Sequence, residues 1–338
     1  MDWRQLHGDV FANKRVLVTG AAGFIGSHLV EALVALGSEI VALDDLSRGT
    51  WDNLRGFDSG VRKVTASILD EAAVDEATQG CRFVFHQAAL GSVPMSVEQP
   101  LLYHEVNVLG TVKVLEAARK AGVQRVMFAA SSSAYGDPPG SGDAAKVESM
   151  EVLPRSPYAA TKVACEAAVR AWAHSYGLDT VSLRYFNIFG PRQDPNSAYA
   201  AVIAAFAKAM IGRKAGMIFG DGDQSRDFTF VANAVHANLL AARCGKPLEG
   251  AVLNVAMGQR ITVNELHRQM AAYFGVPDKP SYRAVREGDV LHSLADLTRT
   301  RAAIGYSPLV DFSTGLKATC EWYAANLPRI PGAGVTSA

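Results

Sequence analysis

Short apolar runs alternate with stretches of helical periodicity through the first half of the chain. Runs of apolar and β-branched residues, as in buried parallel strands, occur at residues 16–19, 40–43, 83–85, 126–129 and 180–183. Helical spacing of apolar residues predicts helices over 29–36, over about 107–121 and around Tyr158. The alternation predicts an α/β fold in which helices cover both faces of a doubly wound parallel sheet.

The second half is built of shorter pieces. Proline and glycine residues interrupt it between Pro191 and Gly222, and helices are predicted over 199–211, 231–243 and 263–274. We therefore expect a Rossmann domain over residues 1–184 and a smaller C-terminal α/β substrate domain over 185–330, interleaved with the first at its boundary. Residues 331–338 are expected to form a disordered tail.

A glycine-rich turn follows the first predicted strand. Gly20, Gly23 and Gly26 are spaced three apart, which lets the backbone turn tightly, approach a pyrophosphate and pack a helix against the strand. Asp44 ends the second strand, 18 residues after Gly26, where a carboxylate can accept the ribose hydroxyls. Strand, glycines, helix, strand and acid in this order predict a dinucleotide site. The acid favours NAD, although Arg48 nearby leaves NADP possible.

Tyr158 and Lys162 stand one helical turn apart, so both side chains lie on one face of a helix. Pro157 suits the first turn of that helix. Free tyrosine has a pKa of about 10, and a pKa near 7 requires roughly 4 kcal/mol of preferential stabilisation of the phenolate. Lys162 and a cationic cofactor are a source of that stabilisation. The alternative is a surface tyrosine beside a solvated lysine.

Polar residues follow several predicted strands. Gln87 and Ser131 to Ser133 come after strands, as the glycine turn and Asp44 do, so we expect them to meet in one crevice at the carboxyl edge of the sheet. In the second half, Arg192, Arg226 and Arg286 lie in separate loops, which suits a ligand with phosphates. The alternative is surface salt bridges, for instance between Arg226 and Asp227.

Composition excludes several classes of partner. The 338 residues include 33 basic and 33 acidic ones, so net charge favours neither nucleic acid nor a membrane surface. Residues 1–14 contain no signal-peptide core, and no apolar window is long enough to span a membrane. The four cysteines are far apart and form no metal-type pair. We expect a cytoplasmic protein with reduced thiols and no metal.

These motifs resemble the extended short-chain dehydrogenases/reductases over nearly the whole chain. The resemblance rests on residues 19–26, 131–136, 184–191 and the Tyr158 and Lys162 pair. Within that family, residues 192–203 and 286–296 resemble the bacterial enzymes that interconvert UDP-N-acetylglucosamine and UDP-N-acetylgalactosamine. The resemblance implies NAD-dependent 4-epimerisation of a UDP-sugar through a transient 4-keto intermediate. It also implies a homodimer formed through helices near 106–121 and 158–176.

The resemblance assigns roles to individual residues. Tyr158 would be the base, Lys162 would hold the nicotinamide ribose and lower the pKa of Tyr158, and Ser131, Ser132 and Ser133 would contact the reacting oxygen. The implied cofactor-binding residues are Gly20, Gly23, Phe24, Ile25, Gly26, Asp44, Asp45, Ser47, Gly49, Ser67, Ile68, Gln87, Ala88, Tyr158, Lys162 and Tyr185. The implied substrate-binding residues are Ser92, Ser131, Ser132, Tyr158, Asn187, Gln193, Ala201, Val202, Arg226, Arg286, Asp289 and Ser293. Ser67 departs from the family pattern, which often has an acid there.

Related activities remain as alternatives. Dehydratases and decarboxylases of this family commonly carry an acid after the first hydroxyl residue of the Ser131 strand end, whereas this chain has Ser132 and Ser133. UDP-glucose/UDP-galactose and UDP-glucuronate 4-epimerases need no such acid. A nucleotide-sensing protein of the same fold has no need for both Tyr158 and Lys162. The small Ser293 favours an N-acetylated sugar, because it leaves room in the pocket.

Overall fold

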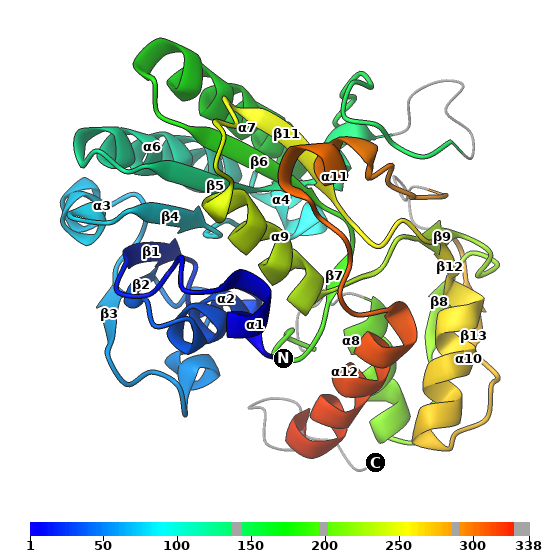
Figure 1. Cartoon of the computed structure of the whole chain (residues 1–338). Coiled ribbons are helices and arrows are strands. Elements are labelled where there is room, and N and C mark those ends of the chain that lie inside the picture. Colours follow the sequence, from blue (N-terminus) through cyan, green and yellow to red (C-terminus); the bar gives the residue numbers. More distant parts are fainter. Residues whose placement is uncertain (137–143, 196–201, 286–290, 328–338) are drawn as a thin grey trace.

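The computed structural model describes residues 1–136, 144–195, 202–285 and 291–327. Its main layer is a seven-stranded parallel sheet with the strand order β11-β6-β5-β4-β1-β2-β3 (Figure 1). The strands are β1 (Arg15–Thr19), β2 (Glu39–Asp44), β3 (Val61–Thr65), β4 (Phe83–His86), β5 (Arg125–Ser131), β6 (Thr180–Tyr185) and β11 (Ala251–Val255). The predicted doubly wound parallel sheet is therefore confirmed.

Helices cover both faces of this sheet. Those of the sheet region are α1 (Trp3–His7), α2 (Phe24–Ala35), α3 (Glu71–Thr78), α4 (Val93–Glu98), α5 (Pro100–Tyr103), α6 (Gly110–Lys120), α7 (Pro157–Tyr176), α9 (Val231–Arg243) and α11 (Thr298–Ile304). Short 3₁₀ turns are η1 (Trp51–Leu54) and η3 (Ser132–Tyr135), and η2 (His104–Leu109) is a π-helical stretch. Helices α2 and α9 pack on one face, and α3, α6 and α7 on the other.

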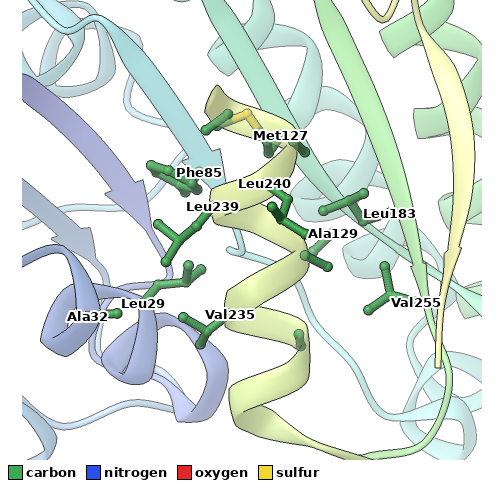
Figure 2. Packing of buried hydrophobic residues seen from close by; sticks show 14 of the residues in the cluster. Leu29, Ala32, Phe85, Met127, Ala129, Leu183, Val235, Leu239, Leu240 and Val255 are labelled. Carbon is green, nitrogen blue, oxygen red and sulfur yellow. The ribbon is translucent and has the colours of Figure 1, made fainter. Parts of the chain in front are cut away.

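Successive side chains of each strand point to opposite faces of the sheet, and because helices bury both faces, the strands are apolar throughout. In β4, Phe83 and Phe85 join the core under α2 and α9, whereas Val84 joins the core under α3, α6 and α7. Figure 2 shows Phe85 in the first core, with Leu29 of α2 and Leu239 of α9 nearby. Each fully buried side chain of this kind contributes about 1.5–3 kcal/mol relative to exposure.

A smaller region lies beyond the carboxyl edge of the sheet (Figure 1). It contains α8 (Val202–Ile211), α10 (Val263–Phe274), α12 (Phe312–Asn326) and three two-stranded pairs, β7 (Ile188–Phe189) with β10 (Thr229–Phe230), β9 (Ser225–Arg226) with β12 (Ile261–Thr262), and β8 (Met217–Phe219) with β13 (Ser281–Arg283). Its helices share a separate core that includes Phe206, Leu266 and Phe312.

The two regions interleave more deeply than a boundary at residue 184 implies. Strand β11 pairs with β6 inside the main sheet, and α9 covers that sheet, although both elements come from the second half of the chain. Residues 231–243 and 251–255 therefore belong structurally with residues 1–184, and a single division of the chain at 184 does not describe the sheet region.

Two helix boundaries differ from the prediction. The first long helix begins at Phe24, within the glycine motif, because Gly26 packs directly on the Gly20 carbonyl. The helix predicted over about 107–121 is regular only from Gly110, because η2 and α5 precede it. The predicted tail over 331–338 lies outside the described residues. Among the helices that the structure describes, none is long and apolar enough to cross a membrane.

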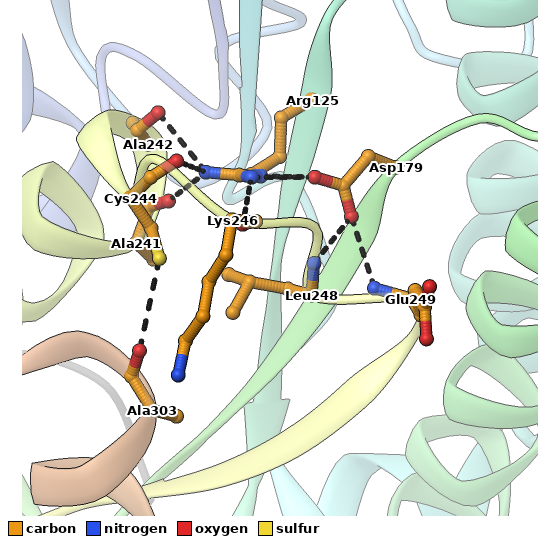
Figure 3. A network of polar contacts seen from close by, with 9 residues as sticks. All are labelled: Arg125, Asp179, Ala241, Ala242, Cys244, Lys246, Leu248, Glu249 and Ala303. Atoms are coloured by element: carbon orange, nitrogen blue, oxygen red, sulfur yellow. Dashed lines mark hydrogen bonds and ion pairs between the residues drawn. The ribbon is translucent and has the colours of Figure 1, made fainter.

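Arg125 ties the end of α9 to the sheet (Figure 3). Its guanidinium, in a residue only 2% exposed, donates to the carbonyl oxygens of Ala241 (2.6 Å), Cys244 (2.9 Å) and Lys246 (2.8 Å). Its Nε also donates to Asp179 Oδ2 at 2.6 Å. A cation at a helix C-terminus satisfies carbonyl groups that have no partner within the helix. Arg125 thereby fixes α9 against β5.

We expect Arg125→Met to destabilise the protein by about 3–5 kcal/mol, because it leaves the Asp179 carboxylate and several carbonyl oxygens without their cation. Thermal unfolding should show a clearly lower midpoint. Arg299→Met, at an exposed arginine of α11, should shift the midpoint little, since exposed substitutions usually change stability by less than about 0.5 kcal/mol. Equal midpoints for the two variants would contradict the role of Arg125.

Candidate active site

Two cavities meet at the carboxyl edge of the sheet. The smaller, of about 490 Å³, is lined by the glycine turn, the start of α2, and the ends of β2, β4 and β5. The larger, of about 820 Å³, is lined by the end of β5, the start of α7, the last residue of β6 and the three residues that follow it. Both cavities are lined by Tyr158 and Tyr185. Ligands in doubly wound sheets bind at this edge, so a dinucleotide and a second ligand could meet at Tyr158.

The glycine turn is shaped for close backbone approach. A Cβ on Gly26 would lie 2.0 Å from the Gly20 carbonyl oxygen, and one on Gly20 would lie 2.7 Å from Ala88 N. Gly20 also has a φ of +66°, a conformation that favours glycine. Gly23 caps α2 without a side-chain hydrogen bond, and Gly23 to Gly26, at the N-terminus of this helix, line the cavity. These features fit a dinucleotide pyrophosphate.

Asp44 lies where the ribose hydroxyls were expected. Its carboxylate accepts hydrogen bonds from Ala22 N (2.9 Å) and Leu46 N (2.8 Å), and it lines the smaller cavity. Burial raises the pKa of Asp44, and the backbone hydrogen bonds oppose that effect. A carboxylate has about four acceptor positions, so capacity remains for ribose hydroxyls. Asp45 adjoins it in the lining, and two acids disfavour a 2′-phosphate there.

The structure brings together nearly all of the expected cofactor residues. The smaller cavity is lined by Gly20, Gly23, Phe24, Ile25, Gly26, Asp44, Asp45, Ser47, Gly49, Ile68, Gln87, Ala88, Tyr158, Lys162 and Tyr185. Ser67 is not among its lining residues, because its hydroxyl is turned to Leu69 N at 3.2 Å. The expected contact of Ser67 with the adenine end stays a prediction.

Asn238 of α9 supports this cavity from behind, and sequence reasoning missed it. Its amide donates to the Tyr185 hydroxyl (2.6 Å), which donates to Gln87 Oε1 (3.1 Å), and Gln87 Nε2 donates back to Asn238 Oδ1 (3.4 Å). The closed ring orients Gln87 and Tyr185 in the lining. Asn238 is 0% exposed and lies inside a helix of the second half, so no local pattern marks it.

Helix α7 positions Tyr158 and Lys162 as expected. Ser156 caps the helix by accepting a hydrogen bond from Ala159 N at 3.1 Å, and Pro157 occupies the first turn. Lys162 Nζ donates to the Ala129 carbonyl at 2.7 Å and lies 5.9 Å from the centre of the Tyr158 ring. Lys162 is only 4% exposed, which excludes a solvated surface lysine.

Burial acts on the pKa of both Tyr158 and Lys162. Burial raises the pKa of Tyr158, and the hydrogen bond with the Ser131 side chain lowers it only in part. Burial also lowers the pKa of Lys162 to about 8. The Lys162 ammonium donates its hydrogen bond to the Ala129 carbonyl. The lowering of the Tyr158 pKa that we expected requires Lys162 together with a cationic cofactor, and it stays a prediction.

Three consecutive serines lie at the end of β5 and the start of η3. Ser131, Ser132 and Ser133 all line the larger cavity beside Tyr158. Ser133 Oγ donates to Ser131 Oγ at 2.9 Å, and Ser133 N also points to Ser131 Oγ at 3.2 Å. Ser131 in turn hydrogen-bonds Tyr158. A short chain of hydroxyl groups therefore ends at the phenol, and it can pass a proton to or from that oxygen.

The expected substrate residues divide into three groups. Lining the larger cavity are Ser131, Ser132, Tyr158, Asn187, Gln193, Arg226 and Ser293. Ser92 and Val202 are not lining residues: the Ser92 hydroxyl caps α4 by accepting from Met95 N, and Val202 packs against the core of the smaller region. Ala201, Arg286 and Asp289 lie outside the described residues.

Other lining residues were not expected from the sequence. Lys146 and Arg155 add positive charge to the larger cavity, and Val93 and Pro94 of α4 add apolar surface. Among the described lining residues of this cavity there is no Asp or Glu. Lys146 follows a segment without helical or strand periodicity, so only the tertiary fold places it there.

The comparisons with known proteins agree with this site. Residues 16–256 match the model of the NAD dependent epimerase/dehydratase family. The chain belongs to this family. It is 40% identical to a UDP-glucose 4-epimerase of Mycolicibacterium smegmatis, over 91% of this chain and 98% of that protein. The family confirms the predicted enzyme class and NAD cofactor, and with the sheet it confirms the fold.

Solved structures are similarly close. A UDP-N-acetylglucosamine 4-epimerase from Methanobrevibacter ruminantium, in complex with UDP-N-acetylmuramic acid, superimposes with a TM-score of 0.87 and 39% identity, covering 93% of this chain and 99% of that one. The NAD complex of the UDP-glucose 4-epimerase from Thermus thermophilus gives a TM-score of 0.82 and 35% identity, covering 92% and 99%.

Proposed function

We propose that the protein is an NAD-dependent 4-epimerase of UDP-sugars, and that UDP-N-acetylglucosamine and UDP-N-acetylgalactosamine are its substrates. The observation that carries the proposal is the position of Tyr158, whose side chain lines both cavities. A base at that junction contacts the reacting end of a dinucleotide and a sugar hydroxyl at the same time. The relatives named above are 4-epimerases of UDP-sugars, which supports this assignment.

The chain's own residues account for the proton transfers. Tyr158 would take the proton of the sugar 4-hydroxyl, and the Ser131 and Ser133 hydroxyls would hold the same oxygen and relay the proton. Bound NAD⁺ supplies the hydride acceptor and, once reduced, the donor that returns the hydride to the other face of the sugar. The glycine turn, Asp44 and Lys162 would hold its pyrophosphate, adenosine ribose and nicotinamide ribose.

We assign the nucleotide end of the substrate to one wall of the larger cavity, formed by Asn187, Gln193, Arg226 and Ser293. Arg226 would grip the pyrophosphate bidentately, with Asn187 and Gln193 beside it. We keep Ala201, Arg286 and Asp289 as proposed substrate contacts on the strength of the motif resemblance. Ser293 lies on the same wall, where it accepts hydrogen bonds from Asn187 Nδ2 (3.2 Å) and Asp227 N (3.3 Å). A small residue there leaves room for an N-acetyl group.

UDP-glucuronate 4-epimerisation is the second candidate. Lys146 and Arg155 line the larger cavity, and positive charge there favours a sugar carboxylate. Dehydration and decarboxylation are less well supported, because the described lining residues of that cavity include no acid to expel water or steer loss of a carboxylate. Assays of the purified protein with acetylated, plain and uronic UDP-sugars, without added cofactor, distinguish these candidates.

Tyr158→Phe should lower turnover by about 10²–10⁴-fold, the usual contribution of a general acid–base group, while binding of the UDP-sugar survives. The phenylalanine ring keeps the packing and removes only the ionisable oxygen. Turnover can be followed by chromatographic separation of the two epimers, and binding by calorimetry. A variant that keeps more than about a tenth of the wild-type rate would show that another group is the base.

Ser293→Tyr should abolish epimerisation of the N-acetylated sugars and retain that of UDP-glucose and UDP-galactose. A tyrosine fills the wall, and filling a pocket penalises only the bulkier substrate. The matched control Ser293→Ala keeps the pocket open and should keep the wild-type preference. Equal losses on both sugar types would indicate that Ser293 only supports the loop, and the substrate assignment would then lose its basis.

A homodimer through α6 and α7 is the proposed assembly. Ala160, Ala164, Ala167 and Ala171 form a stripe of small residues along α7, and Tyr176 at its end is 56% exposed. Light scattering should therefore give twice the chain mass of 36.0 kDa. Ala164→Arg should give the mass of one chain, whereas Ala72→Arg on the exposed side of α3 should not. A wild-type mass of one chain would exclude the dimer.

A further inference from the structure

Asp227 is a buried carboxylate next to the wall of the larger cavity, but it does not line that cavity. It follows β9, is 0% exposed, and accepts hydrogen bonds from Met257 N (2.9 Å), Gly258 N (3.0 Å) and Ala295 N (3.1 Å). Burial raises its pKa to about 6, and the backbone N–H groups oppose that rise. Burying a carboxylate costs free energy of folding, and this cost points to a role for Asp227 at the neighbouring cavity.

Backbone atoms of Asp227 form hydrogen bonds with two residues that line the cavity, Ser293 and Asn187. Asp227 N donates to Ser293 Oγ at 3.3 Å, and Asn187 Nδ2 lies 3.4 Å from the Asp227 carbonyl and 3.2 Å from Ser293 Oγ. Asn187 has a φ of +38°, an uncommon conformation that surrounding contacts have to maintain. Arg226, Asn187 and Ser293 are all lining residues, and Asp227 contacts or adjoins each of them.

We infer that Asp227 is a positioning residue that holds the Ser293 wall of the sugar-nucleotide pocket in place. Its carboxylate fixes residues 293–295 against residues 257–258, while its backbone fixes Ser293 against Asn187. An amide cannot replace it, because an asparagine has one acceptor oxygen and its NH₂ group would face at least one backbone N–H. The inference rests on the proposed function, since it specifies how the substrate pocket is shaped.

Asp227→Asn should raise the KM for UDP-N-acetylglucosamine by about tenfold, the effect of one badly satisfied buried hydrogen bond, with kcat changed much less. Bound NAD should be unchanged, because the glycine turn and Asp44 are not touched. Val123→Ala is the control: it removes buried apolar surface just before β5, at the opposite edge of the sheet, and should lower the unfolding midpoint. Val123 lines neither cavity, so the KM of this variant should remain that of the wild type. If Asp227→Asn has the KM of this control, the inference is wrong.

Ser293→Ala provides a second route in case Asp227→Asn folds poorly. It removes the oxygen that accepts from Asp227 N and leaves the carboxylate intact. If Asp227 acts through Ser293, the KM increase of the double variant should be smaller than the product of the single increases, whereas independent residues would multiply. If Asp227→Asn does not fold, Ser293→Ala alone must raise the KM, and an unchanged KM would overturn the inference.

Calorimetric binding of UDP-N-acetylglucosamine to the wild type separates the two levels of the proposal. A wild-type protein that neither binds nor converts this substrate would overturn the proposed function, and with it the inference. If the wild type binds and converts this substrate while the Asp227 and Ser293 variants have the KM of the control, only the role of Asp227 is overturned.

Discussion

The burial of Lys162 is the constraint on which the site depends. An ammonium group withdrawn from water loses hydration, and a fall in its pKa from 10.5 to about 8 corresponds to about 3 kcal/mol disfavouring the charged form. The Ala129 carbonyl at 2.7 Å and the Phe128 ring at 4.9 Å offset part of that cost. Both partners belong to β5, so retaining the charge requires α7 to lie on this strand in one register. That register also places Tyr158 at the junction of the cavities.

The second half of the chain completes the site that the first half begins. Arg184 at the end of β6 pairs with Glu166 of α7 at 2.7 Å, which holds the middle of that helix against the sheet. On the opposite face, α9 supplies Asn238 behind Gln87 and Tyr185, and Arg125 fixes the end of α9. A dinucleotide cavity built from residues 20–68 alone would lack this support. The interleaving of the two regions therefore has a structural reason.

The sequence was sufficient for features that depend on local backbone geometry. The glycine turn, Asp44, the capped helix with Tyr158 and Lys162, and the alternation of strands and helices all follow from short-range rules, and the structure agrees with their placement. The ligand contacts expected of Ser92 and Ser67 stay predictions, and in the structure each hydroxyl accepts from a nearby backbone N–H, that of Met95 and that of Leu69. The residues that sequence reasoning missed depend on long-range contacts. Asn238 and Asp227 act through partners far away in the sequence, a separation that periodicity does not report.

Epimerisation sets a demand on the pocket that simple binding does not. A 4-keto sugar has to present both faces to one hydride carrier, so contacts that fix the sugar ring would slow the reaction. Binding energy is better placed at the nucleotide, far from the reacting carbon. The larger cavity offers both kinds of surface: Ser131, Ser132 and Ser133 line it together with Tyr158, and Arg226, Asn187 and Gln193 line it as well. For such a pocket, a rigid wall matters more than additional sugar contacts, because the wall defines the space in which the sugar can turn.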